Sequence, residues 1–372
     1  MTQTKDAVRY IGTPGRYVQG AGALRQLGEY VKPLGTGLFL ITDEKGAQRI
    51  GSDVAAGMEG AGPVEYVLFE KMCCEKEIRL LAERFAQSGC QVVAGAGGGK
   101  HLDMAKAVAA FAHAPMVMLP TVASTDASCS ALSVLYTEDG LFDRYLYLEH
   151  NPDLVLVDTA HIATAPARLL VSGMGDALAT WFEARACAQS GGVNEFGACP
   201  GTAALCLAQG CWENLRRWGK KALAEMQEKK PGKAVEAIVE TNIYLSGIGF
   251  ESGGLAAAHA VNNGLAGLAR GTKSSHGEKV AFGTLVQLML EQRLGAEPEQ
   301  ARNELEQARA FCGEVGLPVS LAQLGFAEMT KEELEQMAAI ALSPADHMKN
   351  MPFAVTSEDL IEAVLAVDAL EQ

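Results

Sequence analysis

The chain has no uninterrupted apolar run of the roughly 18 residues that a membrane-spanning helix needs, and its first residues, MTQTKDAVRY, lack the apolar core of a secretory signal. Its lysines and arginines gather into no basic stripe, and the formal net charge is −14. Such a balance argues against a surface for nucleic acid or anionic membrane. We therefore expect a cytoplasmic protein that acts on small molecules.

Paired cysteines are also missing. The nine cysteines are odd in number and scattered, and none forms a C-x-x-C pair, although Cys73 and Cys74 are adjacent. This argues against a disulfide framework. We interpret the cysteines as small buried hydrophobic residues, with a redox or ligand role as the alternative.

What the sequence does contain is a change of character near residue 160, in a chain of 372 residues that is long enough for two domains. Before it, strand-like runs rich in Val and Leu alternate with helical stretches; the runs are residues 37–42, 64–69, 91–96, 116–121 and 154–158. Runs without strict alternation predict a parallel sheet covered on both faces. After it, only helical patterns remain. We predict an α/β domain that binds a dinucleotide over residues 1–160, an all-helical domain over 161–372, and an active-site cleft between them.

The stretch GAGGGKHLDMAK, residues 95–106, joins an apolar run to a predicted helix. It is not a G-x-G-x-x-G motif, because Lys100 replaces the third glycine, and it is not a P-loop, because His101 follows the lysine. Three glycines, Gly97, Gly98 and Gly99, allow close approach of a diphosphate to the start of the helix. The alternative is a tight turn that binds no ligand.

Two further features follow predicted strands. Asp43 ends the first strand, where a carboxylate can bind the adenosine ribose and repel a 2′-phosphate, which favours NAD over NADP; alternatively it only caps the next helix. A second loop is rich in hydroxyl side chains that can contact a ligand or merely form turns and caps: Thr121, Ser124, Thr125, Ser128 and Ser130.

Three residues of the helical half are candidate metal ligands. Asp176 lies in a predicted helix, His259 stands among alanines and glycines, and His276 begins a helix whose Ser275 and Glu278 have capping-box spacing. Each has an ordinary structural explanation when taken alone. Spacing in the sequence allows them to converge but does not show that they do.

The chain resembles the iron-containing alcohol dehydrogenase superfamily, and within it the glycerol dehydrogenase branch. The resemblance runs nearly end to end and is carried in order by GGGKHLDMAKA, PTVASTDASCSALSVLYT, NPDLVLVD, APARLLVSGMGDALATWFEA and HGEKVAFGTL. It implies a Rossmann-like amino-terminal domain, a helical carboxy-terminal domain, NAD, a divalent metal and a homo-oligomer, often an octamer. The implied activity is reversible oxidation of glycerol or a related small vicinal diol to the hydroxyketone.

The resemblance also assigns residues. It makes Asp176, His259 and His276 the metal ligands, and with them Asp126, as the contact to the polyol, completes the catalytic set. The positions implied to contact the cofactor are Asp43, Gly97, Gly98, Gly99, Lys100, Asp103, Thr121, Ser124, Ser130, Leu132 and Tyr136.

Several positions depart from the family pattern. Iron-dependent members carry a fourth ligand, a histidine, one helical turn after the aspartate, where this chain has Thr180. Two imidazoles and one carboxylate suit catalytic zinc, which we favour, although the same set binds ferrous iron. Other departures, at residues that are not metal ligands, are His101, Asn262, Lys71 and Met72. The histidines outside any motif are expected to be structural or solvated: His101, His113, His150, His161 and His347.

Three alternatives remain open. Arg270 and Lys273 lie close to His276 in the sequence and hint at a phosphate site, as in a sister branch that acts on glycerol 1-phosphate. A lyase of the dehydroquinate synthase type would use NAD and metal without net oxidation. A non-enzymatic NAD-binding sensor is the third alternative, and the intact metal-ligand set counts against it.

Overall fold

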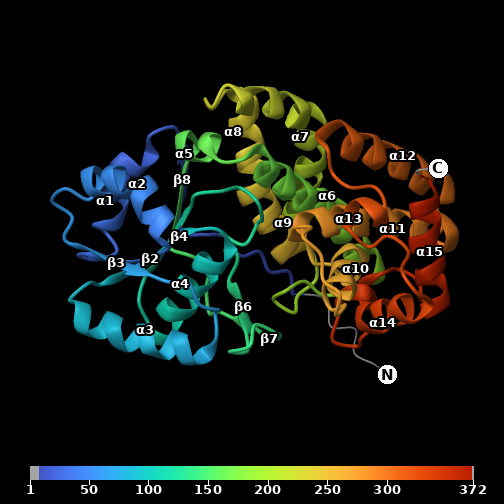
Figure 1. Cartoon of the computed structure of the whole chain (residues 1–372), viewed down its shortest axis with the longest axis horizontal. Helices are drawn as coiled ribbons and strands as arrows, with labels where there is room; N and C mark the ends of the chain where they lie inside the picture. Colours follow the sequence, from blue (N-terminus) through green and yellow to red (C-terminus); the bar gives the residue numbers. More distant parts are fainter. Residues whose placement is uncertain (1–7, 371–372) are drawn as a thin grey trace. The chain divides into compact units, whose positions relative to one another are not determined.

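A computed structural model describes residues 8–370 and divides the chain into two compact units (Figure 1). The sheet unit comprises Gly12–Leu169 and Ala224–Gly247, and the helical unit comprises residues 8–11, Leu170–Leu223 and residues 248–370. The return of the chain to the sheet unit at Ala224–Gly247 was not foreseen from the sequence. The boundary near residue 160, the roles of the two domains and the cleft between them stay predictions.

The sheet unit is built on six parallel strands in the order β1-β8-β5-β4-β2-β3. Their bounds are β1 Tyr17–Gly20, β2 Leu38–Thr42, β3 Val64–Leu68, β4 Val92–Gly97, β5 Met116–Pro120 and β8 Leu154–Asp158. All residues of β2, β4, β5 and β8 are buried, because helices cover both faces. The five predicted strands are present. The structure adds the edge strand β1 and an antiparallel hairpin of β6 (Leu132–Tyr136) and β7 (Phe142–Tyr147).

Helices of the sheet unit form two layers (Figure 1). Alternate residues of β2 and β4, including Leu38, Leu40 and Val92, pack on the apolar side chains of η1 (Ala23–Gln26), α1 (Leu27–Val31) and α2 (Glu44–Gly57). The helices α3 (Glu75–Ser88) and α4 (Gly99–Ala112) cover the other face (Figure 1). The remaining helices are α5 (Thr159–Thr164), α8 (Lys233–Glu240) and the π-helical turn η2 (Thr241–Leu245).

The helical unit contains no β-strand within residues 8–370, as the sequence predicted. Its helices are α6 (Ala167–Ser190), α7 (Thr202–Gln227), α9 (Ser246–Gly253), α10 (Ala257–Ala266), α11 (His276–Leu294), α12 (Pro298–Val315), α13 (Leu321–Leu324), α14 (Lys331–Ala341), η3 (His347–Asn350) and α15 (Ser357–Ala369). The fold class, a Rossmann-like parallel sheet followed by a helical part, is confirmed. Among residues 8–370 no helix is long and apolar enough to cross a membrane.

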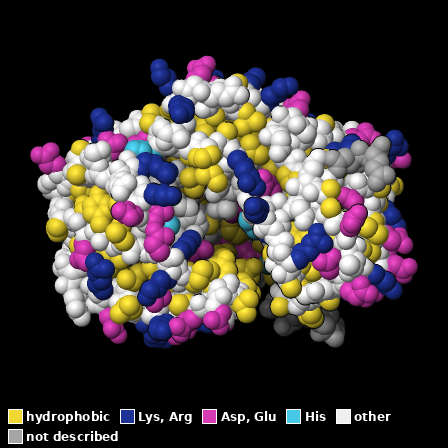
Figure 2. Space-filling view, viewed as in Figure 1, with side chains coloured by type: hydrophobic (Ala, Val, Ile, Leu, Met, Phe, Trp, Pro, Cys, Tyr) yellow, Lys and Arg dark blue, Asp and Glu magenta, His cyan; other side chains and the backbone are white. Residues whose placement is uncertain are grey.

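Most cysteines are buried, as the sequence indicated, and charges of both signs share the visible surface. Seven of the nine cysteines are buried, Cys199 is half-buried and Cys206 is exposed. Burial raises the pKa of the Cys73 thiol to about 12, which keeps it protonated and unreactive. On the face shown in Figure 2, lysine and arginine side chains are interspersed with aspartate and glutamate.

Candidate metal centre and nucleotide pocket

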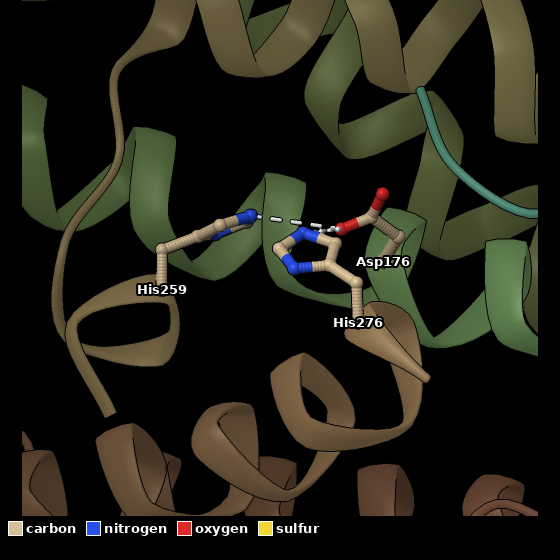
Figure 3. A group of neighbouring side chains, drawn as sticks. All are labelled: Asp176, His259 and His276. Carbon is tan, nitrogen blue, oxygen red and sulfur yellow. Dashed lines mark ion pairs between the residues drawn. The ribbon is translucent and has the colours of Figure 1, made fainter. Parts of the chain in front are cut away.

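Three helices of the helical unit bring Asp176, His259 and His276 together (Figure 3). One ligand atom from each lies within 4.8 Å of the others. The Asp176 Oδ1 atom is 3.2 Å from His276 Nε2 and 3.6 Å from His259 Nε2. The aspartate comes from α6, and the imidazoles come from the first turns of α10 and α11. Residues separated by 100 positions in the sequence therefore present a carboxylate and two nitrogens to one point.

Glycines let these helices approach closely enough. A Cβ on Gly277 of α11 would overlap the Ser172 carbonyl of α6, and a Cβ on Gly283 would overlap the Ala258 carbonyl of α10. The start of α11 is fixed by the predicted capping box, in which Ser275 and Glu278 exchange side-chain and backbone hydrogen bonds. Backbone contact and a cap together determine where His276 points.

The electrostatics of the cluster suit a cation. Burial raises the pKa of Asp176, but the two imidazoles outweigh burial and hold that pKa below its usual range. Burial likewise lowers the pKa of His259, whereas the carboxylates of Glu183 and Asp176 raise it well above its usual value. An almost fully buried carboxylate that stays ionised beside two imidazoles is arranged to attract a positive charge. Two imidazoles and one carboxylate are the donor set of a divalent metal with an open coordination position.

The position four residues after Asp176 is occupied by Thr180, which is 1% exposed. A Cβ on Gly249 of α9 would lie 2.5 Å from the Thr180 methyl group, so this side chain packs against the α9 backbone. The position at which the family resemblance implied a fourth ligand in iron-dependent members therefore holds a packed threonine and no imidazole.

Glu183 is a polar neighbour that sequence reasoning missed. Its Oε2 atom lies 2.6 Å from His259 Nδ1, and its side chain is fully buried. Its spacing from Asp176 could have indicated that it faces the metal centre, because Glu183 lies seven residues after Asp176 and residues seven apart share one face of a helix.

A second site lies in the sheet unit, where β2, β4 and β5 end. A cavity of about 290 Å³ is lined by Asp43, Gly46, Arg49, Gly97, Gly98, Gly99, Lys100, His101, Thr121 and Val122. Gly97 has φ +146°, which favours glycine, and α4 begins two residues later, so its first amides point into the turn. Six residues predicted to contact the cofactor thus share one cavity.

The details of the cavity refine the predictions. Asp43 accepts a hydrogen bond from the Gly46 amide at 2.5 Å, so the cap that we considered as an alternative is present, and its side chain also lines the cavity. Lys100 Nζ donates to the Glu70 carbonyl oxygen. His101, which we expected to be structural or solvated, lines the cavity while its Nε2 lies 3.1 Å from the Phe69 carbonyl oxygen.

The other predicted cofactor contacts are not brought into this cavity. Asp103 is paired with the buried Lys106 at 3.0 Å and accepts a hydrogen bond from the Val134 amide. Lys106 also contacts the Ser130 hydroxyl and the Leu132 carbonyl. The remaining positions expected to contact the cofactor, Ser124 and Tyr136, are half-buried outside the cavity lining. Their cofactor contacts stay predictions.

Asp126, the predicted polyol contact, is 8% exposed and belongs to the sheet unit. Its Oδ2 accepts a hydrogen bond of 2.7 Å from the Ser246 hydroxyl. Ser246 follows the π-helical turn η2, a kind of irregularity that is frequent at functional sites.

Basic residues and histidines elsewhere have structural partners. Arg270, the candidate for a phosphate site, binds Glu333 and the Gly325 and Ala327 carbonyls. His161 pairs with Asp53. The other three histidines that we expected to be structural or solvated lie at a helix end, beside a carbonyl and beside a carboxylate: His113, His150 and His347.

Known proteins match this chain along almost its whole length. A family model described as iron-containing alcohol dehydrogenase matches residues 14–159. A glycerol dehydrogenase of Pseudomonas putida is 47% identical over 98% of each chain, and a glycolaldehyde reductase of Halobacterium salinarum is 43% identical over 96% of each. The crystal structure of a glycerol dehydrogenase of Schizosaccharomyces pombe is similar with a TM-score of 0.91 at 33% identity, over 98% of this chain and 91% of that chain. The chain therefore belongs to the iron-containing alcohol dehydrogenase family and is an oxidoreductase of the alcohol dehydrogenase type.

Proposed function

We propose that the protein oxidises glycerol or a related small vicinal diol to the hydroxyketone, reversibly and with NAD. The observation that carries this proposal is the meeting of Asp176, His259 and His276 around one point. Relatives 43% to 47% identical over nearly the whole chain, named as glycerol dehydrogenases, support the choice of substrate class.

The proposed metal site uses the carboxylate of Asp176 and the Nε2 atoms of His259 and His276. A divalent ion held there would supply Lewis-acid polarisation of the substrate hydroxyl, and NAD would supply the hydride acceptor. The negative charge of Asp176 would attract this ion, and the two imidazoles would hold it in place. The packed Thr180 supports a three-ligand site, and on this ground we propose zinc in preference to iron.

The remaining proposed roles belong to the sheet unit. The amides at Gly98 and Gly99 and the start of α4 bind the cofactor diphosphate, because a helix amino terminus attracts anions. Asp43 binds the adenosine ribose and disfavours a 2′-phosphate. Asp126, oriented by Ser246, binds the hydroxyl next to the reacting carbon and so selects diols over simple alcohols. A homo-oligomer, often an octamer in the family, and a cytoplasmic location are retained as predictions.

A second candidate is reduction of a small hydroxyaldehyde, which the 43% identity to a glycolaldehyde reductase favours. It uses the same site in the reverse direction. Oxidation of glycerol 1-phosphate is disfavoured, because Arg270 is engaged by Glu333 and two carbonyl oxygens.

Absorbance of NADH tests the proposal with glycerol, 1,2-propanediol and glycerol 1-phosphate in parallel, and with glycolaldehyde in the reverse direction. His276→Ala should lose bound metal and turnover but retain NAD binding. His150→Ala is the matched control, because His150 is exposed and its Nδ1 atom lies beside the Asn151 carbonyl oxygen. Near-normal turnover of a metal-free His276→Ala protein would refute the proposal.

A further inference from the structure

The amino terminus of α10 is capped by side chains from two other helices. Its N-cap residue, Ala256, has no side chain that can accept a hydrogen bond. Instead, Glu183 Oε1 on α6 accepts from the Ala256 and His259 amides at 2.9 and 2.8 Å. Gln287 Oε1 on α11 accepts from the two amides between them, at 3.1 and 3.2 Å. All four amides at this helix end are therefore satisfied by two buried groups.

Glu183 differs from Gln287 in having a second oxygen directed at His259. The Oε2 to Nδ1 distance is 2.6 Å. The Oε1 atom of the same group already accepts from two backbone amides, so the side chain acts here as a carboxylate acceptor. The proton of this short hydrogen bond therefore lies on Nδ1. In a neutral imidazole with Nδ1 protonated, Nε2 carries the free lone pair, and Nε2 is the atom that lies beside Asp176.

His276 has no equivalent support. Its side chain is 40% exposed, and within residues 8–370 its ring forms an ion pair with Asp176 and with no second carboxylate. Its orientation is set by the capping box of α11 and by the Gly277 contact. The two imidazoles of the cluster are thus held in different ways, one by a buried carboxylate and the other by its backbone.

We infer that Glu183 is a positioning residue for the metal centre: it fixes the tautomer and ring direction of His259 so that Nε2 faces the ion. This inference rests on the proposed function, because it presumes that Asp176, His259 and His276 bind a metal. A carboxylate behind a ligating imidazole also raises the basicity of that ligand.

Glu183→Gln separates this role from simple capping. The side-chain oxygen of glutamine must still face the Ala256 and His259 amides, which are donors, so its NH₂ group faces His259 Nδ1. The imidazole then has to accept at Nδ1 and carry its proton on Nε2, which blocks the lone pair needed by the metal. Gln287→Leu is the matched control, because it removes the other half of the cap without touching the His259 ring.

The measurement is the affinity of the refolded or metal-stripped full-length protein for zinc and for cobalt(II), by chelator competition, with the visible cobalt spectrum as a second readout. Glu183→Gln should weaken binding by about 10- to 100-fold and change the cobalt spectrum. Gln287→Leu should lower the thermal midpoint of the metal-free protein but leave both readouts near wild type. Glu183→Asp, which keeps the charge one methylene further from Nδ1, should fall between wild type and Glu183→Gln.

The outcomes are separable. If Glu183→Gln and Gln287→Leu both lose stability while Glu183→Gln binds metal as wild type does, Glu183 is a cap only and the inference is overturned. Should Glu183→Gln not fold, wild-type affinity and spectrum in Glu183→Asp overturn it equally. If His276→Ala binds cobalt as tightly as wild type and with the same spectrum, the metal centre itself is elsewhere, and both the proposed function and the inference are overturned.

Discussion

Replacing Gly277 by alanine tests whether the metal centre depends on the close crossing of α6 and α11. A Cβ at this position would overlap the Ser172 carbonyl oxygen and lie 2.7 Å from its carbon atom and 3.0 Å from the Asp176 amide nitrogen. Carbon atoms pack at about 3.5–4.0 Å, so the two backbones must separate by about 1 Å. Because His276 directly precedes Gly277 and Asp176 lies opposite, the separation pulls two proposed ligands apart.

The size of the effect follows from the same contacts. Overpacking a close contact costs about 1–3 kcal/mol, and alanine in a helix returns up to about 1 kcal/mol relative to glycine. Since the clash is with backbone that cannot rotate away, we expect the upper end, a net destabilisation of about 2 kcal/mol. Metal–ligand distances tolerate only about 0.2 Å, so a shift of about 1 Å should empty most of the site and lower kcat by about 100-fold.

Metal content by mass spectrometry, the thermal midpoint, and NADH formation with glycerol measure the three consequences of Gly277→Ala. Gly313→Ala is the control, because it lies in α12 and an added Cβ would meet no atom within 4 Å. We expect that variant to be as stable as wild type or about 0.5–1 kcal/mol more stable. Full metal content and kcat within a factor of about two in Gly277→Ala would refute the argument that backbone contact positions the ligands.

Lys106, the cysteines and His259 give three further predictions. Lys106→Met leaves the Asp103 carboxylate buried without its cation and should lower the free energy of unfolding, measured in urea, by about 3 kcal/mol. The double variant Lys106→Met, Asp103→Leu should recover most of that stability. A loss below about 1 kcal/mol in Lys106→Met would contradict the importance of the pair. A disulfide reagent that modifies thiols should react rapidly at about pH 8 with the exposed Cys206. It should modify Cys73 only after unfolding, because burial raises the pKa of that thiol to about 12. A fast phase of reaction that persists in Cys206→Ser would be the contrary result. In the metal-free protein, burial lowers the pKa of His259, but the carboxylates of Glu183 and Asp176 outweigh burial and raise that pKa above its usual value of about 6.5. Protonation of His259 therefore stabilises the fold fully below about pH 6.5, and this stabilisation is lost as the pH rises through the higher pKa of the folded state. Because metal must displace that proton, chelator competition between about pH 6 and 9 should show affinity rising with pH, and a flat profile would exclude His259 as a ligand.

The local sequence pattern was sufficient to predict the central strands of the sheet but not the edge strand β1 or the hairpin strand β7. The runs that became β2, β4, β5 and β8 are continuous and apolar because both faces are buried, and that composition is visible in one sequence. The edge strand β1 is only four residues long, and its identity depends on pairing with β8, 134 or more residues away. The strand β7 is rich in aromatic residues, as strands often are, but none of its residues is buried, so it lacks the continuous apolar run of the central strands. Long-range pairing, which local periodicity does not encode, defines β1, whereas β7 is defined by its local hairpin with β6.

The candidate metal site was also only partly predictable from the sequence. The residue types and order of Asp176, His259 and His276 were available from family resemblance, whereas their convergence required the helix crossings that Gly277 and Gly283 permit. Asp103 pairs with a lysine three residues later on the same helix face, and this i, i+3 spacing could be read from the sequence; its cofactor contact stays a prediction.

The return of the chain to the sheet unit at Ala224–Gly247 has a consequence for how the protein is made. Every strand of the six-stranded sheet has left the ribosome once residue 158 has emerged, yet η2 is synthesised about 80 residues later. Asn242 of η2 donates to the Ala123 carbonyl, and Ser246, which follows η2, donates to Asp126. The loop expected to bind the polyol therefore stays without its support until part of the helical half exists, and no single cut in the chain can release the α/β half intact.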